Sequence, residues 1–212
     1  MLKETKPVWT LGRKIAGNAL PLLFAFPLFI YGVIGYPTTG MTGSTLAAFA
    51  LFPVVGWLAT NLFGPCGSWG LKDKLGKKLH HERPFDKTEK YLVGFARPSY
   101  RGLLDPHEDI GFLLIHPDRL EFFGDRIRVE LDRKDVKTVG FRPNPHTWLF
   151  LGRWVSIEGE TQGKPVRLLI EPRERATLIG NMKLGSKVHA QVRQWINHPA
   201  SRAVAESLSA SQ

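Results

Sequence analysis

One long stretch in the first third of the sequence lacks charged side chains. No Asp, Glu, Lys, Arg or His occurs from Ile15 to Leu71, a run of 57 residues in a chain of 212. Soluble domains of this size carry charged groups throughout their sequence, so the run excludes a purely soluble protein. One crossing of a hydrocarbon core about 30 Å thick takes about 20 apolar residues, so the run has room for two membrane spans and a turn.

Cysteine is almost absent as well. Cys66 is the only cysteine in the chain, which excludes an internal disulfide framework. A lone thiol agrees with a reducing compartment such as the cytoplasm. Its position directly after the second apolar stretch is one where reversible acylation occurs, and an unmodified thiol is the other interpretation.

The uncharged run divides into two apolar stretches. The sequence predicts one span over Ile15 to Tyr36 and a second over Thr45 to Phe63, joined by the polar connector Pro37 to Ser44. The first stretch is too long for the apolar region of a cleaved signal peptide. No ionisable group lies at membrane depth, which argues against an ion pathway or proton relay within this hairpin.

The flanking charges predict the orientation of the hairpin. The connector carries no charge, whereas both outer flanks are basic, with these residues: Lys3, Lys6, Arg13 and Lys14 before the first span, and Lys72, Lys74, Lys77, Lys78 and Arg83 after the second. Basic residues stay on the cytoplasmic side of a membrane, so we expect an integral protein of the inner (plasma) membrane with both termini in the cytoplasm.

The segment after the second span has the pattern of an interfacial helix. With a step of 100° per residue, Leu71, Leu75 and Leu79 fall on one stripe, and lysines lie beside it. We expect the leucines at the acyl boundary and the lysine ends at lipid phosphates, which predicts a lipid-binding set of Trp69, Lys72, Lys74, Lys77 and Lys78. The alternative is that these lysines only set the membrane topology.

An all-β pattern begins near Glu89. Short apolar runs separated by turn residues predict seven strands, over residues 91–97, 110–116, 120–123, 127–131, 136–141, 154–158 and 166–170. A helical period follows, with a helix over 176–184, a break at Gly185, and a second helix capped by Ser186. The predicted fold class is a membrane α-helical hairpin followed by an all-β domain with a C-terminal α-helix.

The run GFLLIHPDRLEFFGDRIRVELDRKDVKTVGF, residues 111–141, resembles the GRAM and bacterial PH-like domains, in which a strand leads into an acidic-plus-Val corner, here Asp135-Val136. The resemblance covers residues 89–197 and implies a split-barrel or sandwich module that binds lipid head groups or proteins without a cofactor. Members that bind phosphoinositides carry a basic cluster in the first hairpin loop. Here the loop 98–109 departs from that pattern, with Arg101 against Asp105, Glu108 and Asp109.

These patterns predict five segments along the chain. They are a basic cytoplasmic N-terminus at 1–14, the hairpin at 15–63, a basic amphipathic juxtamembrane linker at 64–88, the PH/GRAM-like domain at 89–197, and a disordered tail at 198–212.

Catalytic and metal-binding signatures are sparse. Asp105, His107, Glu108 and Asp109, with His116 near in sequence, are metal-ligand types on one loop, but the pattern is equally that of an acidic turn with hydrated side chains. We favour the turn and predict no metal and no cofactor. No nucleophile elbow or phosphate-binding glycine loop occurs, so we expect a non-enzymatic protein.

Four bulky apolar residues in succession, Trp148 to Leu151, exceed what one face of a strand buries. We predict a patch that binds a protein partner through Trp148, Leu149, Phe150 and Trp154; the alternative is a long strand covered by the terminal helix.

The predicted function is a membrane adaptor or accessory subunit whose domain docks a protein at the inner leaflet. The alternatives are a module that senses anionic lipids and an enzyme acting on a membrane-borne substrate. Residues 91–212 carry 18 basic and 14 acidic side chains, a surplus of only four, so nucleic acid is not an expected partner.

Overall fold

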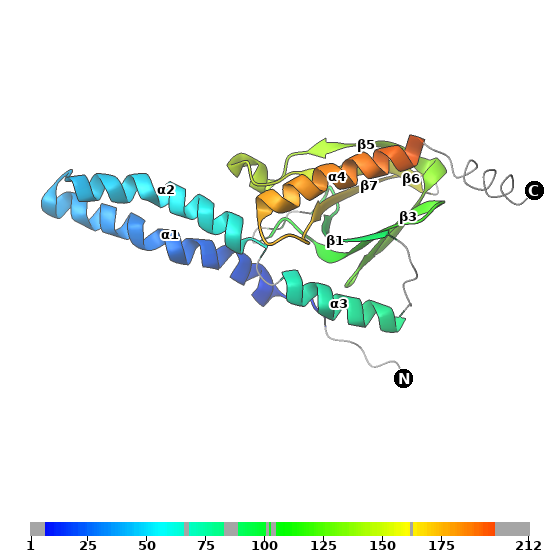
Figure 1. Cartoon of the computed structure of the whole chain (residues 1–212), viewed down its shortest axis with the longest axis horizontal. Helices are drawn as coiled ribbons and strands as arrows, with labels where there is room; N and C mark the ends of the chain where they lie inside the picture. The colour runs from blue at the N-terminus through cyan, green and yellow to red at the C-terminus, as the bar shows by residue number, and fades with distance from the viewer. Residues whose placement is uncertain are drawn as a thin grey trace, which may run out of the picture.

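The computed structural model describes residues 7–65, 68–82, 89–100, 102, 105–161 and 163–197. The chain forms an N-terminal helical region, a seven-stranded antiparallel sheet and a C-terminal helix (Figure 1). The helices are α1 (Leu11–Thr39), α2 (Gly43–Phe63), α3 (Ser68–Glu82) and α4 (Leu178–Asn197). The predicted tail at 198–212 lies outside the described residues.

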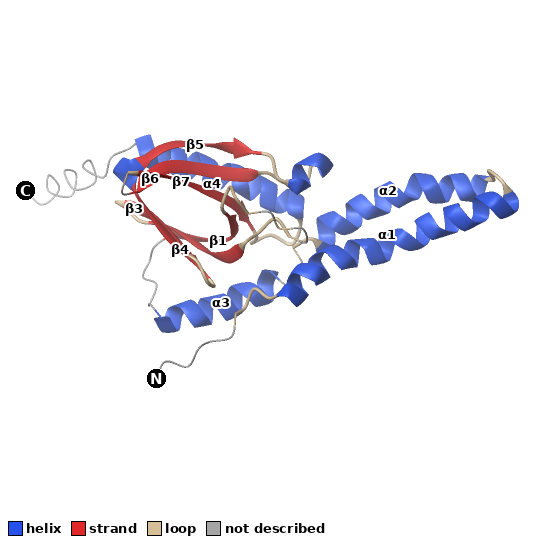
Figure 2. Ribbon diagram, turned by 180° about the vertical axis from the view of Figure 1, so that it is seen from behind, coloured by secondary structure: helices blue, strands red, loops and turns tan. Residues whose placement is uncertain are grey.

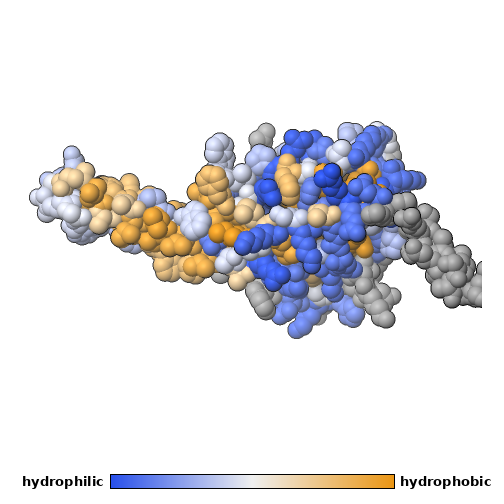
Figure 3. All heavy atoms as spheres, turned by 45° about the horizontal axis from the view of Figure 1, so that its top comes forward, coloured by the Kyte–Doolittle hydropathy of each residue, from blue (hydrophilic) through white to orange (hydrophobic). Residues whose placement is uncertain are grey.

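Helices α1 and α2 form an antiparallel hairpin that projects away from the sheet (Figure 1). Both are long and apolar enough to cross a membrane, by length and composition. Most of their side chains are exposed, and the hairpin surface is mostly apolar while the sheet domain is mostly polar (Figure 3). Small residues bring the two helices close, since a Cβ on Gly56 would lie 3.5 Å from the Cβ of Ala25.

The connector between the two helices is shorter than predicted. Helix α1 continues through Pro37 to Thr39, so only residues 40–42 link it to α2. Gly40 has a φ of 72°, which glycine adopts without strain, and it ends α1. Thr42 caps α2 by accepting a hydrogen bond from the amide of Thr45.

All seven predicted strands are present and form one curved sheet. The strands are β1 (Glu89–Ala96), β2 (Asp109–Ile115), β3 (Arg119–Gly124), β4 (Arg128–Asp132), β5 (Val136–Arg142), β6 (Trp154–Thr161) and β7 (Lys164–Pro172). Their order in the sheet is β4-β3-β2-β1-β7-β6-β5. The predicted corner before Val136 is a 3₁₀ turn, η1 (Arg133–Asp135). A second 3₁₀ turn, η2 (Pro145–Leu149), lies between β5 and β6.

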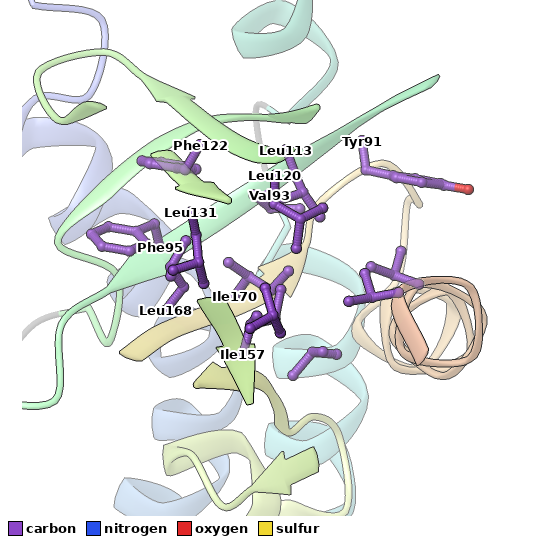
Figure 4. Packing of buried hydrophobic residues seen from close by; sticks show 14 of the residues in the cluster. Tyr91, Val93, Phe95, Leu113, Leu120, Phe122, Leu131, Ile157, Leu168 and Ile170 are labelled. Carbon is purple, nitrogen blue, oxygen red and sulfur yellow. The ribbon is translucent and has the colours of Figure 1, made fainter. Parts of the chain in front are cut away.

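The main core lies between the inner face of the sheet and α4 (Figure 4). Strand β1 sends Tyr91, Val93 and Phe95 to this face, and Phe95 stacks on Phe122 with ring centroids 4.5 Å apart. Leu92, between these residues, points to the opposite face and belongs to a second buried cluster. Because both faces of β1 are covered, its sequence is apolar almost without interruption.

Helix α4 corrects the prediction of two helices with a break at Gly185. The helix is continuous, and Gly185 is buried within it, facing Pro172 and Val155 of the sheet. Ser186 is not a cap, since its hydroxyl donates to the carbonyl of Met182 one turn earlier. The glycine lowers helix propensity locally, but it lets the helix approach the sheet closely, and tertiary packing outweighs the propensity.

Helix α3 corrects the prediction of leucines at the acyl boundary. It lies along the outer face of the sheet (Figure 2), where Leu71 and Leu75 are fully buried against Leu92, Ile110 and Phe112 of β1 and β2. The leucine stripe therefore completes the second cluster of the sheet domain instead of contacting lipid. Residue 79 is the third member of the stripe, and its side chain lies outside the description.

The N-terminal segment joins the same cluster. Trp9 is buried there, and the amides of Val8 and Trp9 both donate to Oδ2 of Asp125, at 2.7 and 3.0 Å. The other carboxylate oxygen of Asp125 accepts from Nζ of Lys78 at 2.6 Å. One buried carboxylate thus holds together the chain start, α3 and the β3–β4 turn.

Truncating the α3 leucine tests this docking. We expect Leu75→Ala to lower the free energy of unfolding by about 2–4 kcal/mol, because a fully buried side chain is removed from a closed cluster. The neighbouring exposed residue supplies the control, since Lys74→Ala should change stability by less than about 0.5 kcal/mol. Thermal unfolding of the full chain in detergent measures both, and equal stability of the two variants would contradict the docked helix.

Candidate functional site

The predicted lipid-binding lysines do not form one exposed row. Nζ of Lys72 bonds Glu174 at 3.2 Å, and Lys78 is largely buried in its ion pair with Asp125. Lys74 and Lys77 are exposed. The side chain of Trp69 lies outside the description. Lipid contact by this set stays a prediction, and the charges of Lys72 and Lys78 are already paired with carboxylates of the domain.

The predicted apolar patch is exposed and lies beside the hairpin. Trp148 is 87% exposed, Phe150 is 83% exposed and Leu149 is 41% exposed. Nε1 of Trp57, on α2, donates to the carbonyl of Leu149 at 2.8 Å, which fixes η2 next to the end of the hairpin (Figure 1). We call the three exposed residues Trp148, Leu149 and Phe150 the apolar loop.

The apolar loop is held rigidly by its own polar residues. The Asn144 side chain accepts from the amide of Thr147 at 3.0 Å, and the Thr147 hydroxyl accepts from the amide of Asn144 at 2.8 Å. This reciprocal cap is completed by the Thr147 hydroxyl donating to the carbonyl of Gly152. Phe150 ends the turn with a φ of 57°, a conformation uncommon for a non-glycine residue. These hydrogen bonds therefore define the backbone conformation from which the exposed rings project.

Trp154 does not belong to this exposed surface, which corrects the prediction that it contacts a partner. It is only 5% exposed, at the start of β6, and its ring packs edge-on against His107 with centroids 5.1 Å apart. Leu151 is fully buried too. Trp154 is the first residue of β6 and lies on the strand face opposite the core residue Val155, where the charge cluster covers it.

A buried charge cluster lies behind the apolar loop, and the sequence did not predict it. The His107 imidazole is buried between two carboxylates, with Nδ1 at 2.7 Å from Asp105 and Nε2 at 3.0 Å from Glu171. Nδ1 of His146 lies 3.4 Å from the same Glu171 carboxylate. Arg173 is 3.2 Å from Nδ1 of His107 through one guanidinium nitrogen, and the other donates to the carbonyl of Gly64 at 3.0 Å.

Glycines make room for this cluster. A Cβ on Gly94 of β1 would lie 2.0 Å from the His107 ring, and a Cβ on Gly152 would lie 2.3 Å from the Glu171 carboxylate. Both approaches are closer than any side chain allows, so the two glycines are required where the charged groups meet the backbone.

The charges of the cluster balance one another. Burial works to raise the pKa of Glu171, but hydrogen bonds from His107 and His146 outweigh it and hold the pKa well below its ordinary value. Burial also works to lower the pKa of His107, yet the Asp105 and Glu171 carboxylates raise it above its ordinary value. The pKa of Asp105 is lowered against the effect of burial, by the His107 and Arg173 charges. Two carboxylates therefore face an imidazolium and a guanidinium.

The interpretation of residues 105–109 as a hydrated acidic turn is wrong for three of its members. Asp105, His107 and Asp109 are buried. The Asp109 carboxylate accepts hydrogen bonds from the backbone amides of Ile110, Arg126 and Ile127. Burial raises the pKa of Asp109. Glu108 pairs with Arg97 at the surface. Within the described part of the chain no group of three or more such side chains is arranged to hold a metal ion.

A cavity of about 740 Å³ separates the hairpin from the sheet domain. Three parts of the chain form its walls. Helix α1 contributes Gly17, Pro21, Leu22 and Ala25, and helix α2 contributes Phe52, Pro53, Gly56, Trp57 and Thr60. The β5–β6 connection contributes Pro145, His146 and the apolar loop. Asp105 and Arg173 of the charge cluster reach its inner end. The cavity is therefore apolar along the hairpin and polar where the hairpin meets the sheet.

The cavity lining includes one hydroxyl side chain, beside the ionisable side chains of Asp105, His146 and Arg173. Thr60 is the one hydroxyl side chain among its described lining residues, and that hydroxyl donates to the Gly56 carbonyl of its own helix at 2.7 Å. It is not placed against a base, which an activated nucleophile requires.

The sequence alone does not identify the charge cluster, because its members lie in two distant segments of the chain. Asp105 and His107 are two residues apart and could be recognised as a pair, but Glu171 lies 64 residues further along the chain. Glu171 lies at the end of β7 and Arg173 directly follows the strand, at positions where charged residues commonly face solvent. Only the pairing of β1 with both β2 and β7 brings the four groups together.

A scan of the chain against protein-family models finds no match, and a search of curated proteins finds no similar sequence. The geometry of the site therefore carries the functional argument.

The charge cluster predicts a defined pH dependence of stability. Since the pKa of folded His107 is raised, its contribution is complete below the pKa of an unfolded histidine, about 6.5, and is lost as the pH rises through the folded pKa. Since the pKa values of Asp105 and Glu171 are lowered, their contribution is complete above the unfolded carboxyl pKa of about 4 and is lost as the pH falls. The cluster stabilises most between about pH 5 and 6.5.

Replacing the histidine tests this assignment. We expect His107→Gln to lower the free energy of unfolding by about 3–5 kcal/mol near the optimum, because two buried carboxylates lose their cation. The loss should shrink as the pH rises from about 6.5 through the raised folded pKa of His107, because the wild-type imidazole then becomes neutral as well. His81→Gln, at an exposed histidine of α3, is the matched control and should follow the wild-type profile. A loss from His107→Gln that is constant across this range would contradict the charged imidazole.

Proposed function

We propose that this protein is a membrane-anchored, non-enzymatic binding module. In this proposal α1 and α2 cross the inner membrane as a hairpin, and a PH-like sheet domain lies on the cytoplasmic side. The domain faces the bilayer with its apolar loop. Strands β1–β4 form one antiparallel meander, strands β5–β7 form a second, and the C-terminal helix covers the core. This arrangement supports the PH-like assignment.

The hydrogen bond from Trp57 to Leu149 is the observation that carries this function. Trp57 precedes the end of α2 by six residues, about 9 Å at 1.5 Å per residue, so it sits where tryptophans gather at membrane surfaces. Because the bond holds Leu149 beside Trp57, the exposed Trp148 and Phe150 would in this proposal lie at the same level, next to the helix surface that faces lipid. In water these rings would cost free energy, and in the interfacial layer they are stabilised.

This placement favours lipid over a soluble protein as the neighbour of the apolar loop. A protein partner predicted for Trp148, Leu149 and Phe150 would have to reach the loop past the bilayer that surrounds the hairpin. The charge cluster supports the same arrangement, because Arg173 bonds the Gly64 carbonyl at the end of the hairpin and fixes the domain against it.

A probe on the apolar loop tests its immersion. In a Cys66→Ser background, Trp148→Cys carrying a polarity-sensitive fluorophore should emit at shorter wavelength in vesicles and be quenched by nitroxide-bearing lipids. The control is Lys164→Cys with the same label, at the exposed β6–β7 turn on the opposite end of β6. Equal quenching of both labels by aqueous iodide would refute immersion and restore the protein-docking hypothesis.

The orientation of the hairpin has a separate test. In the same cysteine-free background, Met41→Cys in the connector should react with an impermeant maleimide from the periplasmic face of sealed membrane vesicles. Lys74→Cys on α3 should react only from the cytoplasmic face. Both positions are exposed in the folded chain, so burial does not limit labelling. Labelling of both from one face would contradict a membrane-spanning hairpin.

A further inference from the structure

We propose that the cavity between the hairpin and the sheet domain binds one acidic amphiphile, with its acid group at Arg173 and His146 and its acyl chain along the hairpin. The inference rests on the proposed membrane-anchored function and names a ligand class for the junction. Three observations support this proposal: the volume of the cavity, the residues that line it and the charged groups at its inner end.

The size and shape of the cavity suit a lipid chain. Its volume of about 740 Å³ falls in the range of small-molecule sites, about 300–1,000 Å³. Lining residues on α1 run from Gly17 to Ala25, about 12 Å along the helix axis. The lining on α2 runs from Phe52 to Gly64, about 18 Å along its own axis. The space is therefore elongated along the hairpin, parallel to membrane lipids in the proposed orientation.

The walls change from apolar to polar along this length. Toward the hairpin the lining is Ala25, Phe52, Pro53 and Gly56, which offer no charged or hydrogen-bonding side chain. The opposite wall is the apolar loop, held to α2 by the Trp57 bond. Leu22 lines the cavity and is also 61% exposed, so the cavity is continuous with the outer apolar surface of the hairpin. A lipid can enter from the side without crossing water.

Near the polar end of the cavity, some hydrogen-bond donors have no acceptor among the described residues. Among the residues that the structure describes, the buried Nε of Arg173 and the buried Nη1 of Arg13 have no hydrogen-bond partner. Arg13 lies one turn before Gly17 on α1, next to the described lining of the cavity but not part of it. His146 lines the cavity and uses Nδ1 toward Glu171, which leaves its Nε2 edge without a protein partner in the described chain.

Charge complementarity favours an acid group over a zwitterion. Asp105 also lines the inner end, but His107 lies 2.7 Å from it and compensates its charge. The Glu171 carboxylate accepts from His107 and His146, and the Arg173 guanidinium completes the charge balance of the cluster. Nζ of Lys14 donates to the carbonyl of His107 at 3.2 Å, which brings another positive charge to the junction. Lys14 thus adds a positive charge beyond the balanced cluster, and a carboxylate or a phosphate accepts from the Arg173 guanidinium that lines the cavity.

Native mass spectrometry of the full chain in detergent tests the site. The probes are palmitic acid, phosphatidic acid and phosphatidylcholine, added separately. We expect a one-to-one adduct with an acidic probe and weak binding of phosphatidylcholine. Binding of palmitic acid alone identifies a free fatty acid as the source of the acid group, and binding of phosphatidic acid identifies a phospholipid. Equal binding of phosphatidylcholine, or no adduct with either acid, would overturn the proposal.

A pair of glycine variants on α1 separates this cavity from lipid bound elsewhere. Gly17 lines the cavity, and a Cβ there would meet only the Gly64 carbonyl within 4 Å, at 3.8 Å, so Gly17→Leu fills the space without a backbone clash. A Cβ on Gly12 meets nothing within 4 Å, which makes Gly12→Leu the matched control. We expect Gly17→Leu to weaken binding of the acidic probe at least about tenfold and Gly12→Leu to leave it unchanged. Unchanged binding by a folded Gly17→Leu protein would refute the site.

The head-group assignment has its own variant. Arg173→Gln should reduce the preference for the acidic probe over phosphatidylcholine about tenfold, since a charge-assisted hydrogen bond is lost. Because Arg173 also bonds Gly64, its thermal unfolding is measured in parallel, and the Gly17 pair keeps the test valid if this variant does not fold. The label on residue 148 should stay immersed in Gly17→Leu. Loss of lipid binding with retained immersion thus tests the cavity apart from the membrane function.

Discussion

The structure depends on the contact between the Arg173 guanidinium and two partners that lie on opposite sides of it. One nitrogen lies against the His107–Asp105 pair, and the other donates to the Gly64 carbonyl at the end of α2. An isolated buried cation would be far too costly, so the carboxylates of Asp105 and Glu171 have to accompany it. This balanced cluster joins the last strand of the sheet to the apolar hairpin and fixes the orientation of one against the other.

The position of the apolar loop follows from that junction. With the hairpin held against the sheet, the β5–β6 connection lies beside α2, and the Trp57–Leu149 bond becomes geometrically available. The loop can then expose Trp148 and Phe150 without exposing them to water, provided that the hairpin is surrounded by lipid. The same features that would be an aggregation liability in a soluble domain fit a domain held at a bilayer.

The prediction for α3 failed for a physical reason that applies to many amphipathic segments. A stripe of leucines with lysines beside it satisfies either a bilayer surface or the open face of a sheet, because both bury apolar surface next to polar surroundings. The outer face of β1 and β2, with Leu92, Ile110 and Phe112, needed a cover, and Leu71 and Leu75 supply it. Nothing within the helix itself distinguishes the two outcomes.

The sequence by itself determined the helices of the hairpin and the strands of the sheet. The 57 uncharged residues predict the apolar hairpin, and short alternating runs separated by turn residues predict the seven strands. Exposure of Trp148 to Phe150 also followed from the sequence, since four bulky residues in succession cannot all be buried by one strand face. Only the tertiary structure decided that Asp105 and His107 meet Glu171 and Arg173, because that contact depends on long-range strand pairing. It also decided that Trp154 points inward and that α3 covers the sheet, since both depend on which surfaces remain to be buried once the strands have paired.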